Sequence, residues 1–123
     1  MKYPYVRRLP RFEYLSPKTV DEALSLLSRH DGEARPIAGG TDLLLRMKRR
    51  EVAPSYLVGL RNIAGLDHVA YDDAQGLRFG PLVTIHVMET SPVIRGKYPI
   101  LSHAASTIGS AQIRNLGTVV GNL

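Results

Sequence analysis

The sequence predicts an α+β protein in two parts, a small α/β part over residues 1–62 and an α+β part over residues 63–123. In the first part, helix-like and strand-like stretches alternate, which is typical of a small parallel sheet with helices packed against it. In the second part, two short strand-like stretches precede a series of helical ones. The stretch LRNIAGL, residues 60–66, is the expected join between the two parts.

Residues 1–15 should be extended and irregular, because Pro4 and Pro10 interrupt regular structure. A helix is then predicted over about residues 20–30. Thr19 followed by Glu22 matches the capping box that begins many helices. The apolar residues that share one face of this helix are Val20, Ala23, Leu24 and Leu27.

A pair of glycines then separates a strand from a helix. The apolar stretch RPIA, residues 35–38, is the candidate strand, and Gly39 and Gly40 cannot continue it. Thr41 and Asp42 are favourable residues for beginning a helix, and the LLLRMK that follows is strongly helix-forming. The predicted order is therefore strand, Gly-Gly turn, helix.

The remaining elements follow from the same kinds of signal. SYLVGL is apolar and β-rich enough to form a buried strand. Thr84 can cap a short helix, and Pro99 suits the first turn of another. The predicted elements are the strand 55–60, two strands within 66–82 joined by a turn at 72–76, helices over 85–91 and 98–109, and a Gly-rich loop region over 110–123.

Composition narrows the class of protein. Apolar residues make up 44% of the chain and charged residues 22%, which is ordinary for a globular domain. There is no cysteine, which removes disulfides, thiolate zinc sites and iron–sulfur ligation from this chain. No apolar run is long enough to span a bilayer, and the first residues have no apolar secretory core, so we expect a cytoplasmic protein.

The net charge of +5 is compatible with nucleic acid, an acidic partner or an anionic cofactor. The densest basic cluster is RMKRR, residues 46–50, which we interpret as a solvated helix end or a face toward an acidic partner subunit. Aromatic residues do not interleave with the basic ones, so a base-stacking surface and nucleic-acid binding are not expected. The four histidines are isolated in sequence, and no metal site is expected.

Two stretches could hold a ligand. In IAGGTDLLL, residues 37–45, the glycines allow close approach of a ligand, and the N–H groups of residues 40–43 lack helical partners, which suits a phosphate. A plain strand–helix turn fits this local pattern equally well. Neither the Walker A nor the Rossmann glycine pattern is present. The second stretch is GSAQIRNLGTVVGNL, residues 109–123, which locally reads as a second ligand segment or as a tail loop.

Four stretches of the sequence resemble, in their order and spacing, the FAD-binding medium subunit of molybdenum hydroxylases. These stretches are AGGTDLLL, LVGL, LRFGPLVTIHVMETS and YPILSHAASTIGSAQIRNLGTVVGNL. This family includes the medium subunit of aerobic carbon monoxide dehydrogenase, the FAD domain of xanthine dehydrogenase and the β subunit of 4-hydroxybenzoyl-CoA reductase. The resemblance implies a PCMH-type (vanillyl-alcohol-oxidase-like) FAD-binding fold. It also implies that 1–62 is the subdomain with the Gly-Gly pyrophosphate loop and that 63–123 begins the second FAD-binding subdomain.

The resemblance also implies which residues contact FAD, and it implies no catalytic acid or base. Phe79 matches a position near the adenine, whereas Gly80 and Thr84 match structural positions. Val120 departs from the family pattern T-x-G-G-N, and it should weaken FAD binding if that position needs a positive φ or close flavin approach. The implied FAD-binding residues are Ile37, Ala38, Gly39, Gly40, Thr41, Asp42, Leu43, Leu44, Phe79, Thr118, Gly121 and Asn122.

The function that the resemblance implies is electron transfer through FAD between a [2Fe–2S] small subunit and an acceptor. Substrate oxidation would occur at a molybdenum-cofactor large subunit, so we expect a hetero-oligomer. Family members continue beyond the equivalent of Leu123, so we expect this chain to be their N-terminal portion. The alternative is a non-catalytic basic interaction module, or a truncated remnant, that does not bind flavin. A standalone flavin oxidase of the wider PCMH-type fold fits the motif pair less well.

Overall fold

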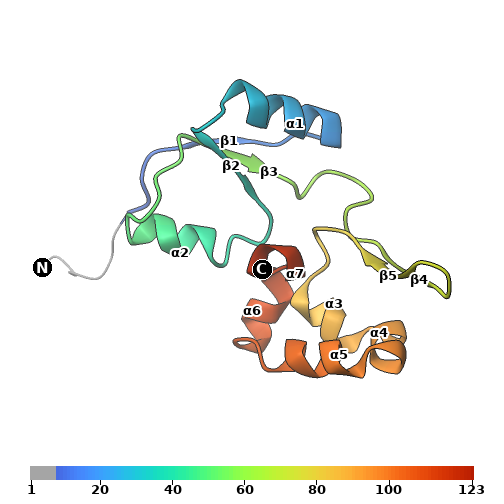
Figure 1. The fold of residues 1–123 in the computed structure, drawn as a ribbon. Helices are drawn as coiled ribbons and strands as arrows, with labels where there is room; N and C mark the ends of the chain where they lie inside the picture. Colours follow the sequence, from blue (N-terminus) through green and yellow to red (C-terminus); the bar gives the residue numbers. More distant parts are fainter. Residues whose placement is uncertain (1–7) are drawn as a thin grey trace, which may run out of the picture. The chain divides into compact units, whose positions relative to one another are not determined.

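The computed structural model describes residues 8–123, which form two compact units divided between Asn62 and Ile63 (Figure 1). The expectation for residues 1–7, including Pro4, falls outside the described residues. Within residues 8–123, no helix is both long enough and apolar enough to cross a membrane.

The first unit contains a three-stranded parallel sheet, as the alternating pattern predicts. Its strand order is β1-β3-β2, so β3 is the central strand and pairs with both neighbours. The chain crosses from one parallel strand to the next through helical segments, which are needed because parallel strands cannot be joined by a tight turn. The elements of this unit are β1 Glu13–Leu15, α1 Val20–Arg29, β2 Ala34–Ile37, α2 Leu43–Lys48 and β3 Tyr56–Gly59.

The prediction that residues 1–15 are irregular is wrong for β1. The three residues of β1 have no strand signal of their own, but they pair with β3 far along the chain. The Glu13 N–H donates to the Ser55 carbonyl at 2.9 Å and extends this pairing. A partner strand at this sequence distance is not visible in the local pattern.

Helix α1 begins and ends with side-chain contacts. The hydroxyl of Thr19 accepts the Glu22 N–H at 3.1 Å, as the capping box predicts. The Glu22 carboxylate accepts the N–H of Lys18 at 2.9 Å, one residue before the cap. At the other end, His30 is the C-cap, and its ring stacks on Tyr56 of β3 with the ring centroids 3.8 Å apart.

The core of the first unit lies around the central strand. Leu57 and Val58 of β3 are buried, although their side chains point to opposite faces of the sheet. Met47 of α2 and Ala23 of α1 are buried as well. A Cβ on Gly59 would overlap the phenol ring of Tyr14, so glycine at this position lets the Tyr14 side chain cross β3.

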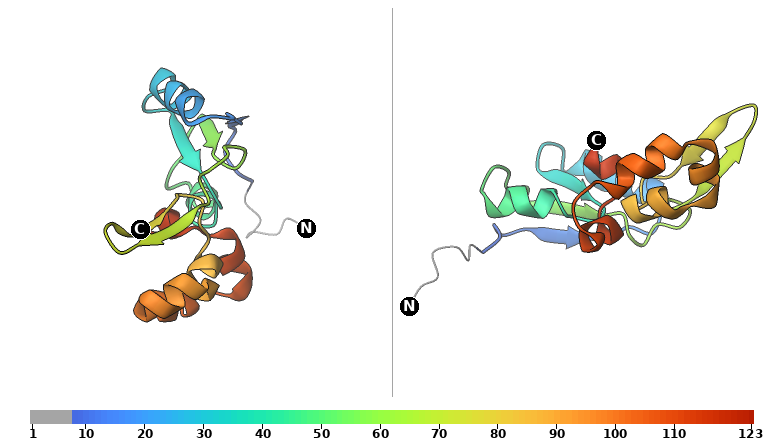
Figure 2. Two further views of the ribbon diagram at one scale, coloured as in Figure 1. Left: turned by 90° about the vertical axis from the view of Figure 1, so that its right-hand side faces the viewer. Right: turned by 90° about the horizontal axis from the view of Figure 1, so that it is seen from below.

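The second unit begins with an antiparallel hairpin and continues with short helices (Figure 2). The hairpin turn is the predicted DDAQG turn, in which the Asp72 carboxylate accepts the N–H groups of Ala74 and Gln75 at 2.9 and 2.7 Å. Gly76 follows with φ +75°. The elements of this unit are β4 Val69–Asp72, β5 Gly76–Phe79, α3 Ile85–Thr90, α4 Pro92–Lys97, α5 Pro99–Ser106, α6 Ala111–Leu116 and α7 Val119–Asn122.

The core of this unit is formed by α3, α4 and α5. Ile85, Met88, Ile94 and Ala105 are buried together, and Phe79 of β5 packs against them. Thr84 caps α3 by accepting the Val87 N–H at 3.1 Å, as predicted. A Cβ on Gly80 would overlap the backbone carbonyl of Leu66, so Gly80 has the structural role that the resemblance implies.

The prediction of a loop region over 110–123 is wrong, because this stretch forms α6 and α7. Ser110 caps α6 by accepting the Ile113 N–H at 3.2 Å, and Thr118 caps α7 by accepting the Gly121 N–H at 3.0 Å. Each cap satisfies an N–H that a short helix otherwise leaves free, and in α7 this offsets the low helix propensity of Gly121.

Candidate functional site

The first candidate segment is the Gly-Gly segment, residues 37–44, which joins β2 to α2. Gly40 has φ +76°, a left-handed conformation that glycine adopts without steric cost. A Cβ on Gly40 would lie 3.1 Å from Leu44 Cδ1 and 3.2 Å from Ile37 Cδ1, so the surface here is closed to a larger side chain. The Leu44 N–H donates to the Gly40 carbonyl at 3.0 Å and closes the turn.

Backbone donors of the Gly-Gly segment are available to a ligand. Within residues 8–123, the N–H groups of Gly40, Thr41, Asp42 and Leu43 form no hydrogen bond to the protein. Asp42 occupies the N-cap position of α2, but its side chain makes no capping bond and the residue is exposed. Successive unpaired N–H groups at a turn suit an anionic group, so this segment fits a pyrophosphate.

The second candidate segment is residues 117–122, called the Thr-Asn segment here. It lies beside the start of α3, where Thr84 and Thr118 form an antiparallel bridge. The Ile85 N–H donates to the Gly117 carbonyl at 2.9 Å, and the Val119 N–H donates to the Val83 carbonyl at 3.1 Å. These two bonds fix the backbone at the beginning of α7.

The polar groups of the Thr-Asn segment differ in availability. Thr118 is buried, and its hydroxyl is bound to the Gly121 N–H, so these two groups hold the turn together. The Asn122 N–H donates to the Thr118 carbonyl at 3.2 Å. Among the described residues, the side-chain amide of Asn122 has no hydrogen-bond partner, and the residue is exposed. Asn122 therefore offers the free polar side chain of this segment.

Phe79 and Asn122 line the same cavity within the second unit, although they are far apart in sequence. The cavity has a volume of about 330 Å³. Its other lining includes Ile85, Met88 and Leu123, so it is predominantly apolar. Thr118 and Gly121 do not line it. Among the predicted second-unit residues, the structure thus brings Phe79 and Asn122 together.

Arg114 has a structural role beside the Thr-Asn segment. Its Nε donates to Glu89 Oε2 at 3.2 Å. Its Nη1 donates to the carbonyls of Ile108 and Gly109 at 3.1 and 3.2 Å. With only 17% of its side chain exposed, Arg114 ties α6 to α3 and to the turn before α6.

Within residues 8–123, no group of three or more His, Cys, Asp or Glu side chains is placed to hold a metal ion. The chemistry of the candidate residues is instead that of backbone amides, one side-chain amide and an aromatic ring. Such groups bind and orient a ligand without transferring protons.

Comparison with known proteins matches residues 10–123 to the family described as the FAD binding domain in molybdopterin dehydrogenase. The chain belongs to this family. The resemblance seen in the sequence motifs is thereby confirmed, and the Gly-Gly and Thr-Asn segments both lie within the matched region. The family match does not favour the alternative of a basic module without flavin.

Relatives of this FAD-binding domain are subunits of several dehydrogenases. The medium chain of glyceraldehyde dehydrogenase from Sulfolobus acidocaldarius is 33% identical over 91% of this chain and 39% of its own length. The medium chain of carbon monoxide dehydrogenase from Hydrogenophaga pseudoflava is 34% identical over 93% of this chain and 39% of its length. The nicotinate dehydrogenase FAD-subunit from Eubacterium barkeri is 38% identical over 91% of this chain and 38% of its own length. The chain thus spans about two fifths of these relatives.

Solved structures confirm the α+β FAD-binding fold. A chain of the Hydrogenophaga pseudoflava carbon monoxide dehydrogenase that lacks the Mo-pyranopterin moiety matches with a TM-score of 0.89 at 34% identity, over 94% of this chain and 40% of that one. A chain of quinoline 2-oxidoreductase from Pseudomonas putida 86 matches with a TM-score of 0.87 at 34% identity, over 93% of this chain and 39% of that one.

The condition under which Val120 was expected to weaken FAD binding through a positive φ is not met. Val120 lies within α7, and Arg50 is the non-glycine residue with a positive φ among those described. Val120 is 45% exposed, so its side chain is not forced against the protein. The FAD-binding domain therefore accommodates valine here without backbone strain.

Proposed function

We propose that this chain is the FAD-binding part of an electron-transfer subunit in a molybdenum-dependent hydroxylase or dehydrogenase. The observation that carries the proposal is the family match over residues 10–123, together with the unpaired backbone donors of the Gly-Gly segment inside that match. Bound FAD would supply the redox chemistry, and the protein would supply binding, orientation and electrostatics. No residue of this chain is assigned an acid–base role.

The Gly-Gly segment would hold the pyrophosphate of FAD. The N–H groups of residues 40–43 would donate to its oxygens, and the Thr41 hydroxyl is a further donor. Gly40 allows the backbone to approach the phosphates because it has no Cβ. The exposed carboxylate of Asp42 can remain in solvent, away from the anion. The remaining residues assigned to this contact are Ile37, Ala38, Gly39 and Leu44.

The Thr-Asn segment would supply the second group of contacts. Asn122 would contact the cofactor directly, because its side-chain amide is free and exposed. Thr118 and Gly121 would act mainly by holding the backbone in position, since their polar groups bind each other. Phe79 would contribute an apolar surface near the adenine, which agrees with its place in the cavity that Asn122 also lines.

The proposed partners are a large subunit with the molybdenum cofactor and a small [2Fe–2S] subunit. The chain would pass electrons between the small subunit and an acceptor. This part of the proposal is supported by the relatives, which are described as medium chains or FAD-subunits of dehydrogenases. The substrate would be oxidised on another chain, so no substrate pocket is assigned here.

A competition experiment tests the proposed pyrophosphate contact. FAD is bound to the full subunit, and ADP or adenosine is then added while the fluorescence of released FAD is followed. ADP carries the pyrophosphate and should release FAD in a saturable manner, whereas adenosine lacks it and should compete poorly. Equal competition by the two compounds, or better competition by adenosine, would show that binding does not depend on the pyrophosphate.

A further inference from the structure

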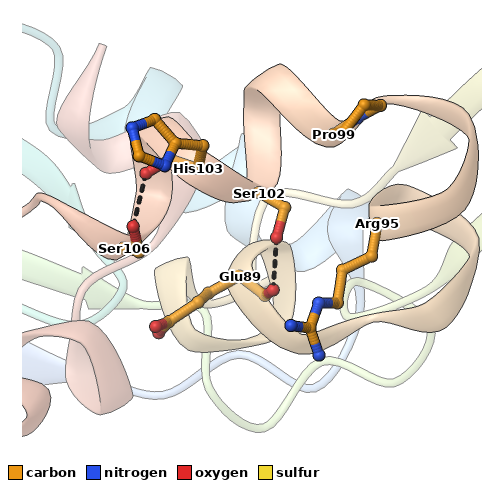
Figure 3. A pocket seen from close by; sticks show the side chains of 6 residues that line it. All are labelled: Glu89, Arg95, Pro99, Ser102, His103 and Ser106. Carbon is orange, nitrogen blue, oxygen red and sulfur yellow. Dashed lines mark hydrogen bonds between the residues drawn. The ribbon is translucent and has the colours of Figure 1, made fainter.

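A second cavity lies within the second unit, formed by the C-terminal part of α3 and the helices α4 and α5. Its volume is about 310 Å³. Figure 3 shows Arg95 projecting from α4 and His103 from α5, with Glu89 between them. The proposed FAD contacts use none of the residues that line it. The lining residues are Glu89, Arg95, Pro99, Ser102, His103 and Ser106.

The charge around this cavity is positive. From residue 91 to residue 123 the sequence contains Arg95, Lys97, Arg114 and His103 but no aspartate or glutamate. Glu89 is the carboxylate that lines the cavity, and its charge is compensated by Arg114 at 3.2 Å. Arg95 forms no ion pair with any residue between 8 and 123. The guanidinium of Arg95 is therefore an uncompensated cation at the cavity.

The polar groups in the cavity wall are already arranged by the fold. Ser102 is buried, and its hydroxyl donates to the Glu89 carbonyl at 2.5 Å, which joins α5 to α3. The Ser106 hydroxyl donates to the His103 carbonyl at 2.5 Å (Figure 3). In both bonds the serine hydroxyl donates its proton to a backbone carbonyl, so neither hydroxyl is left to donate to a ligand. The donors left for a ligand are the guanidinium of Arg95 and the imidazole of His103.

A large apolar side chain is exposed beside this cavity. Ile100 is 77% exposed. Ile100 lies three residues before His103, so the two are neighbours on the surface of α5. A cationic cavity beside an exposed apolar side chain is typical of a protein interface, in which charged groups surround an apolar centre.

We propose that the α4–α5 face, meaning Arg95, Ile100 and His103, binds an acidic and apolar segment of a partner subunit. An aspartate or glutamate side chain of that segment enters the cavity and pairs with Arg95, and a neighbouring apolar side chain covers Ile100. A second copy of this chain is disfavoured, because it would bring the same positive face. The exposed side chain of Ile100 favours a protein over a phosphate backbone. The inference rests on the proposed function, which supplies the partner subunits.

The test compares assembly of the full subunit with its partner subunits for wild type, Arg95→Glu and Ile100→Asp. The equilibrium constant for assembly is measured at low and at high salt. Each variant should weaken assembly by about tenfold or more. Wild-type assembly should weaken as salt rises, and Arg95→Glu should lose most of that dependence. Arg61→Glu is the matched control, since Arg61 is an exposed arginine outside this face, and it should assemble like wild type.

Flavin content separates this inference from the proposed function. Arg95→Glu and Ile100→Asp should retain FAD, because they lie outside the proposed cofactor contacts. Circular dichroism verifies the fold of each variant, and Ile100→Ala replaces Ile100→Asp if the latter does not fold. Unchanged assembly of a folded, FAD-loaded Arg95→Glu variant would overturn the inference and leave the proposed function standing. Binding of a short DNA duplex that Arg95→Glu abolishes while assembly is unchanged would overturn it as well. A wild-type subunit that binds no FAD would count against the proposed function instead.

Discussion

Arg114 of α6 and Glu89 of α3 form an ion pair in which Arg114 Nε lies 3.2 Å from Glu89 Oε2. The side chains are only 17% and 27% exposed, so neither charge is well solvated. The two residues are 25 positions apart in the sequence, and their ion pair joins α3 to α6, the helix that precedes the Thr-Asn segment.

Glu89→Gln should therefore destabilise the protein, because it leaves the guanidinium of Arg114 partly buried beside a neutral group. We expect the free energy of unfolding to fall by about 1–3 kcal/mol. Chemical denaturation followed by circular dichroism measures this change. The control is Arg49→Gln, which removes an exposed partner of Glu51 at 4.0 Å and should cost no more than about 0.5 kcal/mol. Equal losses in the two variants would contradict the assigned role of Glu89.

Gly40→Ala should impair both stability and FAD binding. Alanine would have to adopt the left-handed backbone conformation of residue 40, and its Cβ would lie 3.1 Å from Leu44 Cδ1. The resulting backbone strain should lower the free energy of unfolding by about 1–2 kcal/mol. FAD affinity should fall by about tenfold, because relieving the strain moves the backbone donors. Denaturation and a flavin fluorescence titration measure the two effects.

Gly96→Ala is the matched control for Gly40→Ala. Gly96 lies in α4 without a positive φ, and a Cβ there would meet nothing within 4 Å. Alanine should stabilise this helix by about 0.5–1 kcal/mol and leave FAD affinity unchanged. If Gly40→Ala behaved like Gly96→Ala, the Gly-Gly segment would not be the pyrophosphate site.

Val120→Gly should leave FAD affinity within about twofold of wild type, a difference of under about 0.5 kcal/mol. Val120 has a helical conformation and is 45% exposed, so removing its side chain relieves no backbone strain. The substitution should slightly reduce stability, because glycine is unfavourable in a helix. The affinity is measured by titration with FAD. A large gain in affinity would mean that the valine side chain obstructs the flavin.

Tyr71 should ionise at a higher pH than an ordinary tyrosine. The hydrogen bond from its hydroxyl to Asp73 at 3.0 Å is the main cause that raises its pKa above the ordinary value of 10.0, and desolvation and nearby Tyr98 and Asp72 act in the same direction. Because the folded pKa is raised, the associated stability is present below pH 10.0 and is lost as pH rises through the folded pKa. Asp73→Ala should lower the pKa of Tyr71 in a spectrophotometric titration. Comparison with Tyr71→Phe identifies which step of the titration curve belongs to Tyr71. An unchanged pKa for that step in Asp73→Ala would contradict the assigned cause.

Local sequence patterns predicted the elements whose causes are local. The capping pair Thr19 and Glu22, the turn at Asp72 and the Gly-Gly break before α2 each act over a few residues, and each is found in the structure. β1 was missed because the strand that it pairs with is β3, more than forty residues away. α6 and α7 were missed because glycines suggested a loop, although Ser110 and Thr118 supplied the capping signal that could have revealed them.

The candidate site, like the fold, could be predicted from the sequence only where its causes are local. The turn geometry of the Gly-Gly segment follows from its residues, whereas its assignment to a pyrophosphate depends on the family resemblance. The shared cavity of Phe79 and Asn122 depends on how β5 and α7 pack on α3, and no spacing in the sequence predicts it. The bond between Thr118 and Gly121 likewise shows that a residue in a binding motif can serve the backbone and not the ligand.

The central claim is that this chain binds FAD, and a titration of FAD fluorescence with the purified protein tests it most directly. The titration is performed with the chain alone and with the partner subunits present, and Gly40→Ala is measured in parallel. We predict saturable quenching at equimolar FAD, with weaker binding by Gly40→Ala. The absence of saturable quenching in both conditions would contradict the claim.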